Sequence, residues 1–309
     1  MRAVYWKELA DFFAARRFVV LLLLIALAGV WAAYNASQVI LDEAGQAPTD
    51  FVFLRLFTTS RGDSAITFIF FLGIFGPLLG LSLGFNAINE ERARGTLTRL
   101  LSQPIHRDAL INGKFFAAIT VLGITILCLV LVIIGVGLYT LGFAPGTDEM
   151  ARIALFFVAT LIYVSVWLAL SILFSLAFDR AVVSAMAGLG LWLVLTFFLP
   201  FFSTSIAEIV VSEGESPEIV SADRVKWERR IDRLSPASLY RESTQTLLNP
   251  QIRTLGLITL EDLEGVLPNP VPLGQSVSLI WPHLTGMLAM LALIFATAYL
   301  RFMREEIRP

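Results

Sequence analysis

Residues 89–104, NEERARGTLTRLLSQP, form a charged segment between two long apolar segments. Asn89 is suited to cap a helix, and Glu90 and Glu91 would lie in its first turn, where the helix dipole attracts acids. A single glycine, Gly95, follows, and leucines then recur at helical spacing. The segment is therefore predicted to form a helix with a charged rim and one apolar stripe. The stripe comprises Ala93, Leu97, Leu100, Leu101 and Pro104.

Two interpretations of this helix are open. It can be an ordinary surface helix within a loop, or a helix that presents its apolar stripe to a groove of a partner protein. Gly95 favours the second, because a glycine inside a helix costs about 1 kcal/mol relative to alanine. A residue with that cost is expected to have a use, such as a close approach of the backbone to a partner.

The rest of the chain is unusually apolar. Of its 309 residues, 57% are apolar and 16% are charged, against about 25% charged residues in soluble domains. Apolar runs recur, each about as long as the 20-residue helix that crosses a bilayer core. The composition therefore predicts an all-α integral membrane protein. The net charge of −2 excludes a strongly basic nucleic-acid-binding protein, so no nucleic acid is expected as a partner.

Six apolar runs are predicted to span the membrane. They cover residues 18–39, 65–88, 115–141, 153–178, 182–210 and 279–302. Pro77 and Pro200 fall inside the second and fifth runs, where a proline frees a backbone carbonyl and can bend the helix.

Residues 1–17 precede the first span. Their aromatic side chains fall on one side of a helical wheel, whereas Lys7, Glu8 and Asp11 fall on the other. This pattern is typical of an amphipathic helix that lies in the membrane interface. The alternative, the charged region of a signal peptide, fits less well because acids are present and further spans follow.

Basic residues predict the orientation of the spans, because cytoplasmic loops carry an excess of Lys and Arg. The short loops on one side hold only Arg55, Arg61 and Arg152. Both termini and residues 89–104 are therefore expected on the cytoplasmic side of the cell (inner) membrane. The bases on that side are Arg2, Lys7, Arg16, Arg17, Arg92, Arg94, Arg99, Arg107, Lys114, Arg180, Arg301, Arg304 and Arg308.

The loop of residues 211–278 is expected outside the cytoplasm and is long enough that its charges do not decide the orientation. Residues 222–234 are predicted to form a charged helix. Ser235 would cap a second helix, with Pro236 at its first position. A third short helix is expected after Thr259, where a capping box occurs.

The chain lacks the motifs of an energy-consuming enzyme. It has no GxxxxGK[ST] motif for ATP and no cluster of zinc ligands, so it is predicted to be no enzyme and to bind no cofactor or metal. No Asp, Glu, Lys or Arg lies deep within a predicted span, which disfavours an ion-coupled secondary transporter. The energy for any transport is therefore expected to come from another subunit.

Mildly polar residues within the spans have two interpretations. They can form hydrogen bonds between helices, or they can line a path for an amphipathic substrate. The residues considered for such a path are Asn86, Ser165, Ser171 and Thr196.

The charged segment resembles a known family. Residues 91–97 (ERARGTL) and 100–104 (LLSQP), with Gly113 and Lys114 before an apolar run, are similar to the cytoplasmic signature of type-2 ABC permeases. These are the membrane subunits of ABC exporters. The resemblance is closest to the permeases of nitrous-oxide-reductase maturation transporters. Ala93 departs from the pattern, since relatives often carry a second acid there.

The resemblance extends over the chain, because residues 234–240 (LSPASLY) and 247–250 (LLNP) are similar to the outer loop of the same group. It implies that residues 89–104 form a coupling helix seated in an ATPase subunit. The residues implied in that contact are Glu90, Glu91, Arg94, Gly95, Thr96, Leu97, Leu100, Leu101 and Pro104.

The resemblance also implies an assembly of two permeases, either two copies or one copy and a paralogue, with two ATPase subunits that bind ATP and Mg. The expected function is export of an amphipathic or lipid-like substrate. One alternative is a mechanical or assembly complex that drives an extracytoplasmic partner through residues 211–278. A second alternative is a secondary transporter.

Overall fold

The computed structural model describes residues 2–43, 51–60, 67–93, 95, 106–210, 217–250 and 270–304. Within these residues the regular structure is helical, and six helices are long and apolar enough to cross a membrane. The prediction of an all-α membrane protein with six spans is thus confirmed.

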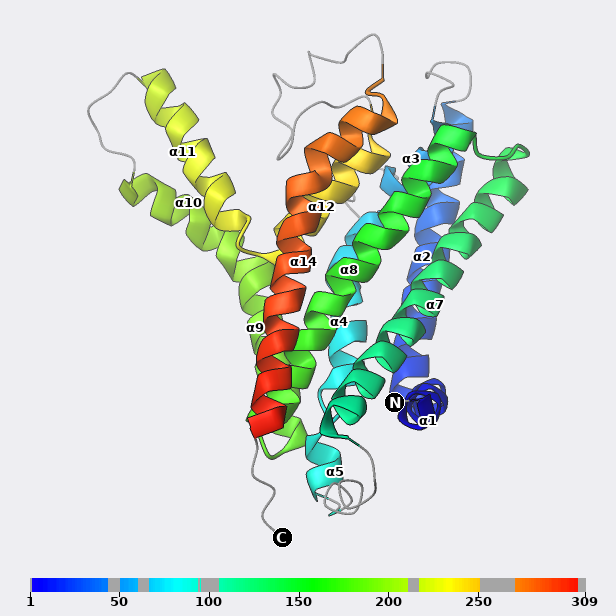
Figure 1. Ribbon diagram of the computed structural model, residues 1–309. Helices are drawn as coiled ribbons and strands as arrows, with labels where there is room; N and C mark the ends of the chain where they lie inside the picture. The colour runs from blue at the N-terminus through cyan, green and yellow to red at the C-terminus, as the bar shows by residue number, and fades with distance from the viewer. Residues whose placement is uncertain are drawn as a thin grey trace.

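The spanning helices form a bundle (Figure 1). They are α2 (Arg16–Asp42), α4 (Phe68–Gly84), α7 (Arg107–Leu141), α8 (Thr147–Ala177), the continuous run of α9 (Ala181–Leu193), η1 (Val194–Phe198) and α10 (Leu199–Val210), and α14 (Leu273–Arg304). The shorter helices are α1 (Arg2–Ala14), α3 (Val52–Thr58), α5 (Asn89–Ala93), α11 (Pro217–Asp232) and α12 (Pro236–Leu248).

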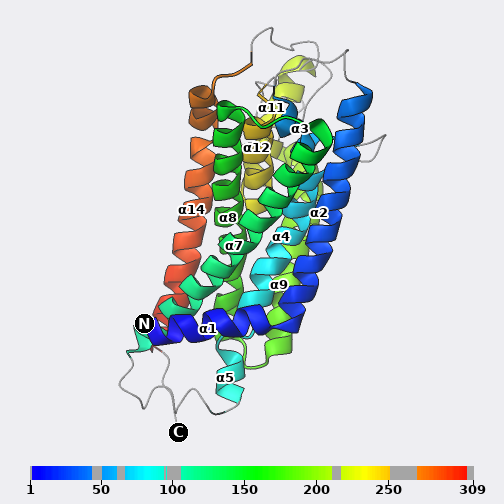
Figure 2. The same ribbon diagram turned by 90° about the vertical axis from the view of Figure 1, so that its right-hand side faces the viewer.

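The two ends of the bundle differ in what they carry. At one end, called the α5 end below, α5 projects from the bundle and α1 lies across it (Figures 1 and 2). At the opposite, α12 end, α12 packs against α8 and α14, while α10 and α11 diverge from the other helices (Figure 1). The short helices therefore occupy both ends, and the spans connect them.

Helices α4 and α8 form the centre of the bundle. In their most apolar windows 61% and 67% of the residues are buried, against 11% in α9–α10 and 17% in α14. A Cβ atom on Gly80 would lie 2.6 Å from the carbonyl oxygen of Val164 and 2.9 Å from the backbone nitrogen of Leu168. Only glycine permits this approach of the two backbones, as is common between membrane helices.

Several helices begin earlier in the chain than the apolar runs from which they were predicted. Helices α7, α8 and α14 begin at Arg107, Thr147 and Leu273, whereas the runs begin at residues 115, 153 and 279. The helices continue into polar sequence that a hydropathy pattern does not include. As a result Lys114 and Arg152 belong to helices rather than to loops.

Pro77 and Pro200 each leave a backbone carbonyl without its helical partner, and a polar side chain donates a hydrogen bond nearby. Within α4, Pro77 cannot donate to Gly73, and the Tyr163 hydroxyl donates to the Gly73 carbonyl at 2.7 Å. Before Pro200 the helix widens into the π-helix η1, and the Ser235 hydroxyl donates to the Leu195 carbonyl at 2.9 Å. The breaks in the spans are thus also attachment points for neighbouring helices.

The loop after α10 contains the expected helices as far as it is described. Helix α11 covers residues 217–232, and Ser235 caps α12 by accepting a hydrogen bond from the Ala237 backbone N–H at 3.1 Å. Pro236 occupies the first position of α12, as the sequence predicts. The third helix, expected after Thr259, lies outside the described residues. The short helix α3, between the first two spans, was not predicted.

Candidate functional site

A buried ionic cluster connects three helices at the α5 end. The Lys114 ammonium of α7 lies 2.9 Å from a carboxylate oxygen of Glu8 in α1 and 2.9 Å from one of Glu91 in α5. The three side chains are 6%, 8% and 14% exposed. Removing one member of a buried ion pair typically costs about 3–5 kcal/mol, because the remaining charge stays buried without compensation. The cluster therefore joins α1, α5 and α7 firmly.

Lys7 balances the charge of this cluster from the solvent side. Its ammonium lies 3.2 Å from a Glu8 carboxylate oxygen and 3.5 Å from one of Asp11. Partial burial lowers the pKa of Lys7, but the neighbouring carboxylates, chiefly Glu8, raise it by more, so that it lies above its usual value. Lys7 therefore stays charged, and Lys7 and Lys114 together balance the charges of the Glu8 and Glu91 carboxylates.

The buried face of α1 differs from the predicted one. Val4, Glu8 and Phe12, spaced four residues apart, are buried, whereas Trp6 is 64% exposed. The assignment of Glu8 to the polar face was wrong, because its carboxylate meets a lysine inside the bundle. Gly113 explains the close contact, since a Cβ atom there would lie 2.9 Å from Val4.

Helix α5 is also attached to α8. The backbone N–H groups of Ile88 and Asn89 donate to the Ser175 hydroxyl at 2.9 and 3.2 Å, and so find an acceptor at the turn between α4 and α5. Arg92 pairs with Asp179 at 2.9 Å, but this pair is exposed and contributes little. Glu90 accepts a hydrogen bond from the side-chain amide of Asn86. The beginning of the charged segment is thus held by the bundle.

The predicted helix does not continue through Gly95. Helix α5 ends at Ala93, and Gly95 has a φ of +66° with its N–H donating to the Arg92 carbonyl at 3.0 Å. Glycine at this position permits the left-handed turn that ends a helix, so its role here differs from that of a glycine inside a helix. The other predicted contact residues Arg94, Thr96, Leu97, Leu100, Leu101 and Pro104 lie outside the described residues, and their contact with an ATPase remains a prediction.

A cavity of about 540 Å³ lies at the α12 end, between α3, α4, η1, α10 and α12. One wall is the face of α12 and its C-cap that carries residues four apart. This wall comprises Ala237, Arg241, Gln245 and Asn249. The other wall is mainly apolar and comes from α4, η1 and α10. It includes Ile69, Phe70, Ile74, Phe197 and Pro200. A lining with a polar part and an apolar part is suited to an amphipathic molecule.

Two stacked tyrosines lie beside this cavity. The rings of Tyr163 in α8 and Tyr240 in α12 are 4.3 Å apart and nearly parallel, with 7° between their planes. The Tyr240 hydroxyl lies 3.1 Å from that of Thr160. Burial raises the pKa of Tyr240 well above its usual value, although the hydrogen bond with Thr160 lowers it slightly. Tyr240 therefore remains neutral and contributes a flat, uncharged surface.

Two further polar contacts hold α12 in place. The Arg152 guanidinium of α8 is fully buried and donates to the carbonyls of Leu247 and Val271 at 3.1 and 2.6 Å. Glu242 of α12 lies 2.6 Å from His283 of α14, and both side chains are buried. Helix α12 is thus bound to α8 and α14 by polar side chains as well as by packing.

A model of the ABC-2 family of transporter proteins matches residues 2–307. The chain belongs to this family. A probable ABC transporter permease protein NosY from Pseudomonas aeruginosa is 29% identical over 282 residues, which cover 89% of this chain and 88% of that protein. A protein of the same name from Stutzerimonas stutzeri is 29% identical over 170 residues, covering 53% and 56% of the two chains. The ABC-2 chain is thus a multi-pass membrane permease subunit of an ABC transporter.

The four polar residues considered for a substrate path do not come together in this ABC-2 permease. Thr196 lines the cavity, but Asn86 lies at the α5 end beside Glu90. Ser171 donates to the Leu81 carbonyl at 2.8 Å, which is a hydrogen bond between helices. The hydroxyl groups of Ser165 and Thr196 are buried without a partner among the described residues.

Sequence reasoning missed the residues that the tertiary structure makes prominent in the permease. Glu8 was assigned to a polar face, Lys114 and Arg152 were assigned to loops, and the contact between Glu242 and His283 was not predicted. For Glu8 and Lys114 the sequence did contain an indication of burial. Glu8 lies four residues from both Val4 and Phe12, and Lys114 directly follows Gly113. Within the described ranges, no group of three or more His, Cys, Asp or Glu side chains could hold a metal ion.

Proposed function

We propose that this permease subunit exports an amphipathic or lipid-like substrate, with energy from a separate ATPase subunit that contacts residues 89–104. The observation that carries the proposal is the buried cluster of Glu8, Lys114 and Glu91. Family membership supports an ATPase partner, and that partner would bind ATP and Mg.

The cluster offers a physical route for coupling. Glu91 lies in the first turn of the charged segment and is paired with Lys114 in the third turn of α7. A displacement of residues 89–104 by an ATPase would have to break this buried pair or move α7 with it. Because breaking the pair costs about 3–5 kcal/mol, α7 and α1 would move together with the segment.

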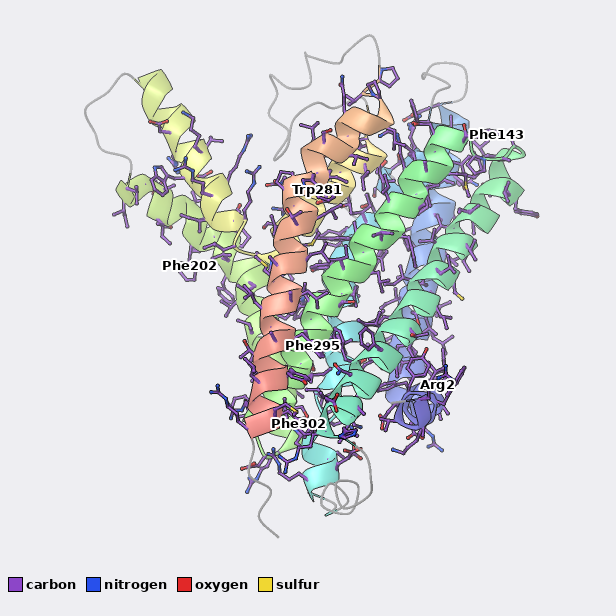
Figure 3. The ribbon with its side chains drawn as sticks, viewed as in Figure 1. Arg2, Phe143, Phe202, Trp281, Phe295 and Phe302 are labelled. Carbon is purple, nitrogen blue, oxygen red and sulfur yellow. The ribbon has the colours of Figure 1, made fainter. Side chains whose placement is uncertain are left out.

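The assembly would contain a second permease, either another copy or a paralogue, and a second ATPase. Helices α10 and α14 carry large apolar side chains at their surface, including Phe202 and Trp281, which are 50% and 62% exposed (Figure 3). Such surfaces suit contact with lipid or with another permease. The permease would lie in the cell (inner) membrane, with its termini and α5 on the cytoplasmic side, where the ATPases would bind.

Co-expression with the ATPase that accompanies this permease tests the proposal. Gly95→Arg and Leu101→Asp are expected to abolish co-purification of the ATPase, or to reduce its permease-dependent ATP hydrolysis at least tenfold. Gly274→Arg is the matched control, because Gly274 is an exposed glycine at the α12 end with open space around its Cα. If all three variants pair with the ATPase and hydrolyse ATP like the wild type, residues 89–104 are not the coupling segment.

A second candidate function is mechanical. Arg152 and the Glu242–His283 pair bind α12 to α8 and α14, so movement of the spans would be passed to the helices of the 211–278 loop and to a partner bound there. Transport measured in vesicles that contain the permease and its ATPase distinguishes the two candidate functions. ATP-dependent accumulation of a lipid-like solute supports export, whereas a bound extracytoplasmic partner without solute movement supports the mechanical function. Accumulation driven by an ion gradient without ATP would replace both with a secondary transporter.

A further inference from the structure

We propose that the cavity at the α12 end binds an anionic amphiphile, with its headgroup at Arg241 and its apolar chain against α4 and α10. The inference rests on the proposed function, since it narrows an amphipathic substrate to an anionic one. It concerns binding, which can be measured apart from ATP hydrolysis.

The charge of the lining indicates the sign of the ligand. Arg241 is an exposed side chain on the cavity wall, and none of the described residues that line the cavity is acidic. Two other arginines that bond to α12 are already paired, since Arg233 lies 3.1 Å from Glu242 and Arg152 lies 2.8 Å from Asp148. Arg241 has no carboxylate partner among the described residues. A guanidinium group binds carboxylates and phosphates through two parallel hydrogen bonds.

The arrangement of the walls indicates an amphiphile rather than a simple anion. Gln245 and Asn249 follow Arg241 along the same face of α12 and offer amide groups to the oxygens of a headgroup. Phe70, Ile74 and Phe197 contribute an apolar surface to the same cavity. The volume of about 540 Å³ falls within the range of about 300–1,000 Å³ that is usual for small-molecule sites. The cavity thus accommodates a charged group and an apolar chain side by side.

A second feature of the cavity lining is Thr196, which lies at a break in the regular helix. The Thr196 side-chain oxygen is buried and makes no hydrogen bond within the described part of the chain, yet Thr196 lines the cavity. A buried polar group without a partner is unfavourable, because it has lost its hydrogen bonds with water. Thr196 also belongs to η1, and single turns of π-helix frequently occur at functional sites. The break in the regular helix therefore lies in the cavity wall.

Native mass spectrometry of the purified permease in phosphatidylcholine nanodiscs provides the test. Two probes, palmitate and phosphatidylglycerol, are added separately and the bound molecules are counted. Arg241→Gln removes the cation, and Lys226→Gln removes an exposed cation from α11 as the matched control. Gly73→Leu fills the cavity from α4, because the nearest atom to a Cβ there is a Tyr240 ring carbon at 3.8 Å.

We expect Arg241→Gln to weaken binding of the anionic probe about tenfold, Gly73→Leu to abolish it, and Lys226→Gln to leave it unchanged. Binding of palmitate alone would identify a free single-chain acid, and binding of phosphatidylglycerol an anionic bilayer lipid. The inference is overturned if neither probe binds, or if both cavity variants bind like the wild type.

Pull-down of the ATPase by the same preparations separates the two proposals. A permease that pairs with its ATPase but binds no anionic probe refutes only the cavity assignment.

Discussion

The two ends of the bundle use charged side chains in opposite ways. At the α5 end Glu8, Lys114 and Glu91 are buried together, and the Lys114 ammonium pairs with both carboxylates. At the α12 end Arg152 is bonded to Asp148, Ser276 and two backbone carbonyls, and Arg241 lines a cavity in which no described residue is an acid. A closed cluster transmits force, because its members cannot separate cheaply. An open cation beside an apolar wall can receive a ligand. The two proposals accordingly place coupling at one end and binding at the other.

The largest effect is expected from removing Lys114, the cation at the centre of the ionic cluster at the α5 end. Lys114→Met leaves the Glu8 and Glu91 carboxylates buried beside a methionine, and it is expected to lower the free energy of unfolding by about 3–5 kcal/mol. Thermal unfolding in detergent measures the effect. Lys226→Met, at an exposed pair on α11, should change it by less than about 0.5 kcal/mol. Equal effects of the two substitutions would show that the α5 end is not a closed ionic joint.

The connection between the two ends can be loosened at the contact of α4 and α8. Gly80→Ala places a Cβ atom 2.6 Å from the Val164 carbonyl oxygen and is expected to cost about 1–3 kcal/mol through overpacking. Gly190→Ala is the control, since nothing lies within 4 Å of its Cβ position, and it should stabilise α9 by up to about 1 kcal/mol. The two unfolding temperatures should therefore shift in opposite directions. A shared direction would contradict the close approach of α4 and α8.

The smallest expected effect is a pH dependence at the α12 end. Burial raises the pKa of Glu242, but the hydrogen bond with His283 and the charge of Arg233 lower it by more, so it lies below its usual value. A carboxyl group whose pKa is lowered on folding adds stability above its unfolded pKa of about 4.3, and this stability is lost as the pH falls through the folded value.

The unfolding temperature should therefore decline as the pH is lowered from about 5 to below 4. Glu242→Gln should flatten part of this decline, whereas Glu228→Gln, on α11, should leave the slope as in the wild type. An unchanged slope in Glu242→Gln would mean that this carboxylate does not hold α12 to α14.

Much of the fold followed from local patterns in the sequence. Apolar runs predicted the spans, and Ser235 with Pro236 predicted the start of α12, because capping depends on a few adjacent residues. Hydropathy did not predict where helices continue into polar sequence, so Lys114 and Arg152 were assigned to loops. Gly95 was interpreted as part of a longer helix, since sequence alone does not reveal the left-handed φ that ends α5.

The candidate site was less accessible to sequence reasoning. Of the residues considered for a substrate path, Thr196 borders the cavity, whereas Arg241 and Gln245 were not considered. Their spacing on α12 is visible in the sequence, but the apolar wall opposite them comes from α4 and η1. A cavity between distant segments has no signature in any one of them.

The sequence by itself determined that this chain is a helical membrane protein with six spans, because the length of an apolar run and the thickness of a bilayer are local quantities. It also contained the residues that identify the ABC-2 family. Only the tertiary structure decided that Glu8 meets Lys114, 106 positions away, and that Arg241 faces an apolar wall. Such contacts depend on how whole helices pack, and packing brings together side chains that no periodic pattern relates.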